Sequence, residues 1–138
     1  MNAESPRPFP SPSPLVLIVE DDADTFEMYG EFLSFYGFEI AHARNGLEAL
    51  ELAQSLKPSV ITTDIGLGGA LDGCQLTEIL KTSAETRQIP VVVVTGWATG
   101  ALGESARHAK CDAVLLKPCL PQDLLATIRQ LLDTHLDA

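Results

Sequence analysis

Short apolar runs alternate along the chain with longer segments in which apolar residues recur every three or four positions. Apolar runs of four or five residues are typical of strands that are covered on both faces of a sheet. The periodic segments between them are typical of helices that cover such a sheet. The predicted strands are 15–19, 38–42, 59–63, 90–94 and 113–116, and the predicted helices are 23–36, 46–56, 74–82, 102–109 and 122–132.

This fivefold alternation of strand and helix predicts an α/β fold, a parallel five-stranded sheet between two layers of helices. Local signals support the helix boundaries. Asp22 stands at an N-cap position, Gly37 at the C′ position of the same helix, and Pro58 blocks the continuation of the second helix. Helix 102–109 has the weakest pattern, because a Gly-containing approach precedes it.

Residues 1–14 alternate proline with small polar residues. Such a segment is extended and cannot pack a core, so we expect a disordered leader. The remaining residues, 15–138, fit one domain in length. After Leu132 few residues remain, and we expect no DNA-binding or enzymatic module to follow.

The net charge of −10 argues against a nucleic-acid surface, which needs clustered Lys and Arg, and against adhesion to anionic lipid. No apolar run approaches the ~20 residues of a membrane helix, and no signal peptide is present. The three cysteines form no C-x-x-C pair and are typical of reduced, packed residues in a cytosolic protein. We therefore expect a cytoplasmic location.

Reactive side chains stand where the predicted strands end. Glu20 and Asp21 follow the first strand, Asp64 follows the third, Thr95 the fourth and Lys117 the fifth. In an open parallel sheet, ligands bind at the carboxyl ends of the strands. Taken alone, each residue also suits a turn or a helix cap. The set as a whole predicts one site at a single edge of the sheet.

Adjacent carboxylates repel one another unless a positive charge lies among them. Mg²⁺ meets this need, because it prefers oxygen ligands and keeps several waters. A carboxylate can also attack phosphorus to give an acyl phosphate. Phosphoryl transfer needs positive charge on the phosphoryl oxygens, which a metal and Lys117 can supply. The chemistry expected at this edge is therefore phosphoryl transfer to a carboxylate.

The chain resembles the receiver domain of two-component response regulators, and in pattern the single-domain chemotaxis regulator. The resemblance covers about residues 15–135. It implies a flavodoxin-like (βα)5 fold with strand order 2-1-3-4-5. The matching stretches are Leu17–Asp22, Thr63–Ile65 with the later Asp72–Gly73, Ile89–Thr95 and Leu116–Pro118.

The resemblance also implies the chemistry of a phosphorylation-dependent switch. Asp64 would accept a phosphoryl group from the phosphohistidine of a sensor histidine kinase or a phosphotransfer protein. Asp64 would also help to hold Mg²⁺, together with Asp21 directly, Glu20 through a water molecule, and the main-chain carbonyl of Gly66. The chain would catalyse only its own phosphoryl uptake and autodephosphorylation.

Two further residues carry the implied response. Lys117 would pair with the phosphoryl oxygens, and Thr95 would move toward them and report their arrival to the fourth helix and fifth strand. Output would be contact with a downstream protein through the face formed by the fourth helix, the fifth strand and the fifth helix. The family often has Tyr or Phe at the position of Val114. Because this chain has no aromatic residue there, we expect the conformational change to be transmitted chiefly by the loop 96–103.

The loop after the third strand also departs from the family pattern. Gly68 stands where a proline is usual, and the loop is one residue longer before Asp72. Gly96 replaces the usual alanine after Thr95, and Trp97 follows it. The resemblance implies that Gly66 and Trp97 tune the lifetime of the phosphate.

Four alternatives fit the sequence less well or remain open. A haloacid-dehalogenase-type phosphohydrolase would need an Asp where Gly66 stands. A flavin or nucleotide binder would need its glycine fingerprint after the first strand rather than the third. A degenerate receiver that acts only as an interaction module, or a shuttle in a phosphorelay, stays open.

Overall fold

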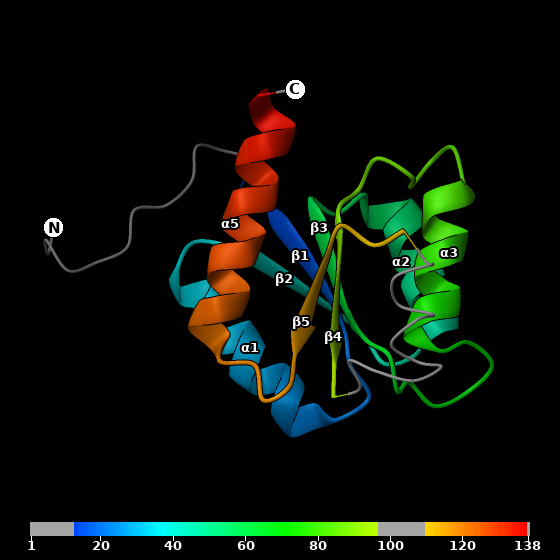
Figure 1. The fold of residues 1–138 in the computed structure, drawn as a ribbon, viewed down its shortest axis with the longest axis horizontal. Coiled ribbons are helices and arrows are strands. Elements are labelled where there is room, and N and C mark those ends of the chain that lie inside the picture. The colour runs from blue at the N-terminus through cyan, green and yellow to red at the C-terminus, as the bar shows by residue number, and fades with distance from the viewer. Residues whose placement is uncertain (1–12, 97–109, 138) are drawn as a thin grey trace, which may run out of the picture.

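The computed structural model describes residues 13–96 and 110–137 of the chain. Its five strands form one parallel sheet in the order β2-β1-β3-β4-β5, as predicted (Figure 1). The leader up to residue 12 and the predicted helix 102–109 lie outside the described residues. The strands are β1 (Leu15–Val19), β2 (Glu39–Ala43), β3 (Val60–Asp64), β4 (Val91–Thr95) and β5 (Ala113–Leu116).

Helices cover both faces of this sheet, because its strands are apolar on both sides. Figure 1 shows the pair α1 and α5 on one face and the pair α2 and α3 on the other. The core is accordingly divided into two apolar clusters, one between the sheet and each pair. The four described helices are α1 (Ala23–Phe35), α2 (Gly46–Leu56), α3 (Gly73–Thr82) and α5 (Pro121–Asp137).

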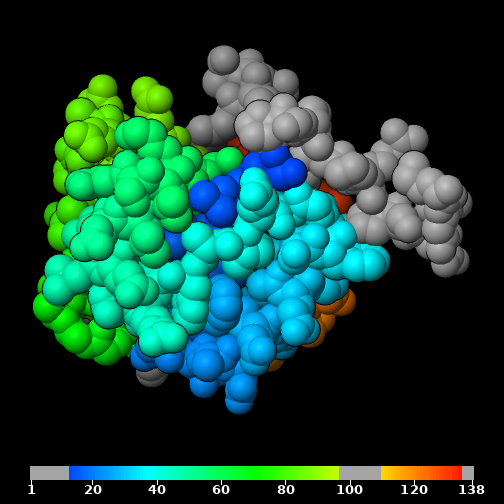
Figure 2. Space-filling model, turned by 180° about the vertical axis from the view of Figure 1, so that it is seen from behind, coloured from blue at the N-terminus to red at the C-terminus, as the bar shows by residue number. Residues whose placement is uncertain are grey.

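Seen from behind, the segments that hold α1, β2 and α2 lie next to one another, coloured from blue through cyan to teal (Figure 2). In the strand order, β2 lies at one edge of the sheet and β5 lies at the opposite edge. Among the described residues, no helix is long and apolar enough to cross a membrane.

Side-chain caps fix the helix starts at the end of the sheet where the strands finish. The carboxylate of Asp22 accepts a hydrogen bond from the Thr25 N–H at 3.0 Å, and Asp72 accepts one from the Gln75 N–H at 2.8 Å. The side-chain oxygen of Gln75 in turn accepts a hydrogen bond from the Asp72 N–H at 3.0 Å, which completes a capping box. These caps satisfy N–H groups that would otherwise lack partners.

Several predicted boundaries were off by one residue, and the end of α5 was off by five. α5 begins at Pro121 and ends at Asp137, five residues beyond the predicted end at 132. Proline is tolerated in the first helical turn, and the last turn of α5 is polar, so apolar periodicity could not reveal it. α1 ends at Phe35 rather than 36, α3 begins at Gly73 rather than 74, and β2, β3 and β4 each begin and end one residue later than predicted.

β5 differs in character from the four other strands. Its residues alternate between half-buried and exposed, and Val114 and Leu116 are 40% and 54% exposed. The four-residue run had predicted a strand covered on both faces. One face of β5 instead presents apolar side chains at the surface, which bears on where a partner protein could bind.

Candidate functional site

The carboxyl ends of β1, β3, β4 and β5 bring the predicted site residues to one edge of the sheet. The register pairs Val19 with Thr63, Asp64 with Val94, and Thr95 with Leu116. The residues that follow these positions therefore emerge side by side, although they are far apart in sequence. This arrangement follows from parallel pairing and the short loops that each strand feeds.

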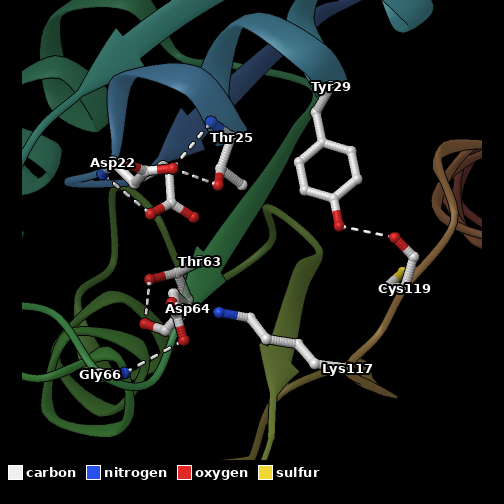
Figure 3. Close-up of polar contacts among 9 residues, drawn as sticks. Asp22, Thr25, Tyr29, Thr63, Asp64, Gly66, Lys117 and Cys119 are labelled. Atoms are coloured by element: carbon white, nitrogen blue, oxygen red, sulfur yellow. Dashed lines mark hydrogen bonds and ion pairs between the residues drawn. The ribbon is translucent and has the colours of Figure 1, made fainter.

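Asp64 and Lys117 form the central ion pair of this edge. The Lys117 ammonium lies 2.7 Å from Oδ2 of Asp64, and Figure 3 shows the two side chains pointing at each other. Oδ1 of Asp64 accepts a hydrogen bond from the Gly66 N–H at 3.2 Å. The Asp64 side chain is 12% exposed and that of Lys117 is 41% exposed. The carboxylate is thus held in place but still open to a reactant.

The ion pair with Asp64 affects the pKa of Lys117. Partial burial alone would lower that pKa, but the hydrogen bond and the negative charge of Asp64 raise it above its usual value. Glu20 and Asp21 add smaller contributions in the same direction. Lys117 therefore stays positively charged at neutral pH, as the role predicted for it beside phosphoryl oxygens requires.

Glu20 is buried beside Asp64 and carries a perturbed carboxyl. Burial raises its pKa from 4.5 to about 6, and the negative charge of Asp64 contributes in the same direction. A hydrogen bond from the Asp22 N–H, 3.0 Å long, opposes this rise. Asp21 is exposed at the surface, and its neighbouring side chain adds to the rise of the Glu20 pKa. Acidic oxygens thus converge beside the ammonium of Lys117, which forms an ion pair with Asp64.

This donor set fits Mg²⁺ better than it fits a metal held wholly by protein. Among the described residues, no three His, Cys, Asp or Glu side chains are arranged to hold a metal ion by themselves. Mg²⁺ is usually bound by one or two carboxylates and keeps several waters, which phosphoryl oxygens can replace. A buried carboxyl whose pKa is raised toward 6 is the kind of group that a nearby cation would return to its charged form.

Thr95 and Gly66 occupy the neighbouring positions that the sequence predicted. Thr95 ends β4, is 1% exposed, and its main-chain carbonyl accepts a hydrogen bond from the Lys117 N–H at 2.8 Å. Gly66 is exposed two residues after Asp64. The structure therefore places all six predicted site residues at one end of the sheet, with Asp64 and Lys117 in direct contact.

Sequence reasoning missed two residues that support this site. His42 is a satisfied residue, which is what the sequence leads one to expect of it, but its partners could not be named in advance: its Nε2 lies 2.8 Å from the main-chain carbonyl of Glu20, and its ring stacks on Phe26 at 3.7 Å. Tyr29 was predicted as part of a core stripe, yet its hydroxyl donates a 2.8 Å hydrogen bond to the Cys119 carbonyl. Neither contact has a periodic signal in the sequence, because each depends on tertiary geometry.

The three cysteines add no reactive group to this edge. None of them forms a disulfide, and burial raises the pKa of each thiol, that of Cys74 to about 11. A thiol that stays protonated at neutral pH is a poor nucleophile and a poor metal ligand.

Comparison with known proteins places the chain in a defined group. The family model described as the response regulator receiver domain matches residues 16–129. The polar-differentiation response regulator DivK of Brucella anthropi is 36% identical over 117 residues, which cover 85% of this chain and 94% of that protein.

Solved structures agree with this match. The signal receiver domain of a signal transduction histidine kinase from Syntrophus aciditrophicus superposes with a TM-score of 0.84 at 29% identity, covering 88% of this chain and 92% of that one. The receiver domain of a sensor histidine kinase from Pseudomonas aeruginosa shares the fold, with a TM-score of 0.81 at 22% identity over 87% of this chain and 98% of that one. That structure contains a magnesium ion coordinated in its active site cleft.

Proposed function

Because the chain belongs to the response regulator receiver family, whose members are phosphorylation-dependent signalling switches, we propose that Asp64 is the residue that becomes phosphorylated. The single observation that carries this proposal is the ion pair between Asp64 and Lys117 at the carboxyl end of β3. No other carboxylate of the site makes a direct ion pair with Lys117 among the described residues. A degenerate receiver would have no need of this pair.

The proposed reaction transfers a phosphoryl group from a histidine to a carboxylate. A carboxylate oxygen of Asp64 forms a bond to phosphorus as the bond from phosphorus to the histidine nitrogen breaks. The electron pair of that bond leaves with the imidazole. The product is an acyl phosphate on Asp64, and attack by water on phosphorus later returns the free carboxylate and inorganic phosphate. Receiver domains are generally not enzymes, and this chemistry would be confined to the chain's own Asp64.

The residues around Asp64 supply what this transfer requires. Lys117 would move its ammonium from the Asp64 carboxylate to the phosphoryl oxygens, which lie one bond further out. Asp21, Glu20 through a water molecule, Asp64 and the carbonyl of Gly66 would hold Mg²⁺. The bound ion would supply positive charge to the phosphoryl oxygens. Burial and the negative charge of Asp64 raise the pKa of Glu20, and a cation beside these carboxylates would offset both effects, which supports this role.

The proposed switch ends in contact with another protein. Thr95, buried at the end of β4, would move toward the phosphoryl oxygens. Position 114 on β5, where the family often has an aromatic residue that reports this movement, holds the smaller apolar Val114. Its side chain is 40% exposed. Leu116 and Leu120 are 54% and 53% exposed. These apolar side chains support the β5–α5 side as the surface for a downstream protein, with a histidine kinase or phosphotransfer protein as the donor.

Incubation with acetyl phosphate and Mg²⁺, followed by intact-protein mass spectrometry, tests the proposal. We expect a mass increase of one phosphoryl group, which hydroxylamine removes because it cleaves acyl phosphates. Asp64→Asn should abolish the increase. Asp24→Asn, at an exposed carboxylate in the first turn of α1, is the matched control and should leave it unchanged. A modified Asp64→Asn protein, or an unmodified but folded wild-type protein, would contradict the proposal.

A further inference from the structure

The turn that carries Lys117 is largely exposed, yet Lys117 must reach a fixed point. Lys117, Pro118 and Leu120 are all exposed, and Cys119 is half-buried. Two tertiary hydrogen bonds bracket this turn. At its start the Lys117 N–H donates to the Thr95 carbonyl at 2.8 Å, and two residues later the Cys119 carbonyl accepts from the Tyr29 hydroxyl at 2.8 Å.

The Tyr29 contact joins α1 to the turn between β5 and α5. Figure 3 shows the phenol to one side of the site with its hydroxyl directed at the Cys119 carbonyl, while the Lys117 side chain extends toward Asp64. Tyr29 also lines one small cavity together with Glu20, Asp64 and Lys117. Its side chain therefore borders the phosphorylation site directly, although the hydroxyl itself bonds to the main chain of the turn.

Core packing alone accounts for the ring of Tyr29 but not for where its hydroxyl bonds. The residue is 8% exposed and packs in the cluster between the sheet and helices α1 and α5. A buried phenol needs a hydrogen-bond partner. The partner here is the turn after Lys117 rather than a carbonyl of a helix or a strand. Burial raises the pKa of Tyr29 to about 12, so the hydroxyl remains a donor throughout the neutral pH range.

Lys117 needs such support because its own ion pair is a weak restraint. An ion pair with a partly exposed lysine contributes little to stability, and a lysine side chain gives up rotamer entropy when it is held. Misplacement by about 1 Å can reduce a phosphoryl-transfer step about 100-fold. A backbone anchor close to the lysine limits this loss without adding charge to the site.

We propose that Tyr29 is a positioning residue, which fixes the Lys117–Cys119 turn through the Cys119 carbonyl and thereby sets the affinity of the site for a phosphoryl group. This inference rests on the proposed function, because it assigns Lys117 to the phosphoryl oxygens. It predicts an effect on the phosphoryl ligand and none on the metal, because the proposed metal ligands lie after β1, at the end of β3 and in the loop that follows β3, away from the turn that Tyr29 holds.

Tyr29→Phe tests the inference, because it removes one oxygen and keeps the ring. Binding of the phosphoryl mimic beryllofluoride at saturating Mg²⁺ would be followed by NMR titration, and binding of Mg²⁺ alone by calorimetry. We expect Tyr29→Phe to weaken beryllofluoride binding about two- to tenfold, the range of one neutral hydrogen bond. Mg²⁺ affinity should change less than about twofold. Tyr36→Phe, which removes the same atom from the residue at the C-cap of α1, is the matched control and should change neither.

A double-mutant cycle distinguishes positioning from a general loss of stability. In the Lys117→Ala background, Tyr29→Phe should have no further effect on beryllofluoride binding, because the group it positions is gone. An equal loss in both backgrounds, a parallel loss of Mg²⁺ affinity, or no loss in Tyr29→Phe would overturn the inference while leaving the proposed function intact. Failure of the folded wild-type protein to bind beryllofluoride would instead overturn the proposed function, and this inference with it.

Discussion

The main chain of Gly73, at the start of α3, lies so close to that of Asp64 that a β-carbon at position 73 would collide with the Asp64 carbonyl oxygen. The Gly73 N–H donates to the Ile65 carbonyl at 2.9 Å, and the Gly73 carbonyl accepts from the Thr77 hydroxyl at 2.7 Å. The atoms that a β-carbon at position 73 would meet belong to the main chain of Asp64 and Ile65, which cannot move aside. The absence of a side chain at Gly73 therefore allows α3 to begin directly against the strand that ends in Asp64.

Gly73→Ala should therefore destabilise the fold and shift Asp64. We expect the free energy of unfolding to fall by about 1–3 kcal/mol, the typical range for overpacking a closed site. Urea unfolding measures the loss. Gly30→Ala is the matched control, because a β-carbon there meets its neighbours at 3.6 Å or more. That substitution should stabilise α1 by up to ~1 kcal/mol, since glycine is a poor helix former. Equal effects at the two positions would contradict this account.

Glu20 should make the stability of the metal-free protein depend on pH. Its pKa is raised from 4.5 to about 6 in the folded state, so the folded protein holds this proton more tightly than the unfolded chain does. The resulting stabilisation is complete below pH 4.5 and is lost as the pH rises through 6. The loss amounts to about 2 kcal/mol, since one pKa unit corresponds to about 1.4 kcal/mol.

Glu20→Gln isolates this contribution, because glutamine resembles the protonated acid and still accepts the Asp22 N–H bond. In EDTA, the variant and the wild type should be about equally stable at pH 4. At pH 7 the variant should be the more stable by about 2 kcal/mol of unfolding free energy, because only the wild type loses this stabilisation. Glu27→Gln, at an exposed carboxylate of α1, should show no such growth. A constant difference across the pH range would show that Glu20 does not hold its proton as the structure indicates.

The convergence of Asp64 and Lys117 could be predicted because each follows an apolar strand in a regular β-α alternation. In a parallel sheet, that alternation alone determines which edge the strand ends share. The contacts of His42 and Tyr29 could not be predicted in this way. Both residues occupy positions that strand or helix periodicity already explains, and their polar atoms find partners only after packing is complete. The polar last turn of α5 was missed for the related reason that it carries no apolar period.

Mg²⁺ should bind chiefly through Asp21, whose exposed carboxylate is the most accessible of the acidic groups at the site. We expect Asp21→Asn to weaken Mg²⁺ binding at least about tenfold, since even the partners of metal ligands affect affinity to that extent. Calorimetric titration measures this directly. The wild-type protein should also gain about 2.7 kcal/mol of stability at a Mg²⁺ concentration of 100 Kd. Asp24→Asn should leave both values unchanged, and a matching loss in that variant would argue against a specific site.

The far end of the sheet holds a second polar network that should affect stability but not phosphorylation. Lys81 in α3 lies 2.7 Å from Oδ2 of Asp112 and donates a 2.8 Å hydrogen bond to the Ile89 carbonyl. The same Asp112 oxygen accepts the Val91 N–H at 2.8 Å, where β4 begins. The Lys81 and Asp112 side chains are only 10% and 27% exposed. This pair therefore joins α3 to the beginnings of β4 and β5.

Lys81→Met should leave Asp112 with a poorly solvated charge and no cation beside it. Breaking a fully buried pair costs ~3–5 kcal/mol, and the partial exposure of Asp112 should reduce this to about 2–3 kcal/mol. The double variant Lys81→Met with Asp112→Asn should recover part of the loss, because the uncompensated charge is then removed. Urea unfolding measures stability, and acetyl phosphate labelling under native conditions measures phosphorylation. Asp64 lies at the opposite end of β3, so a folded Lys81→Met protein with impaired labelling would show that the two ends of the sheet are coupled.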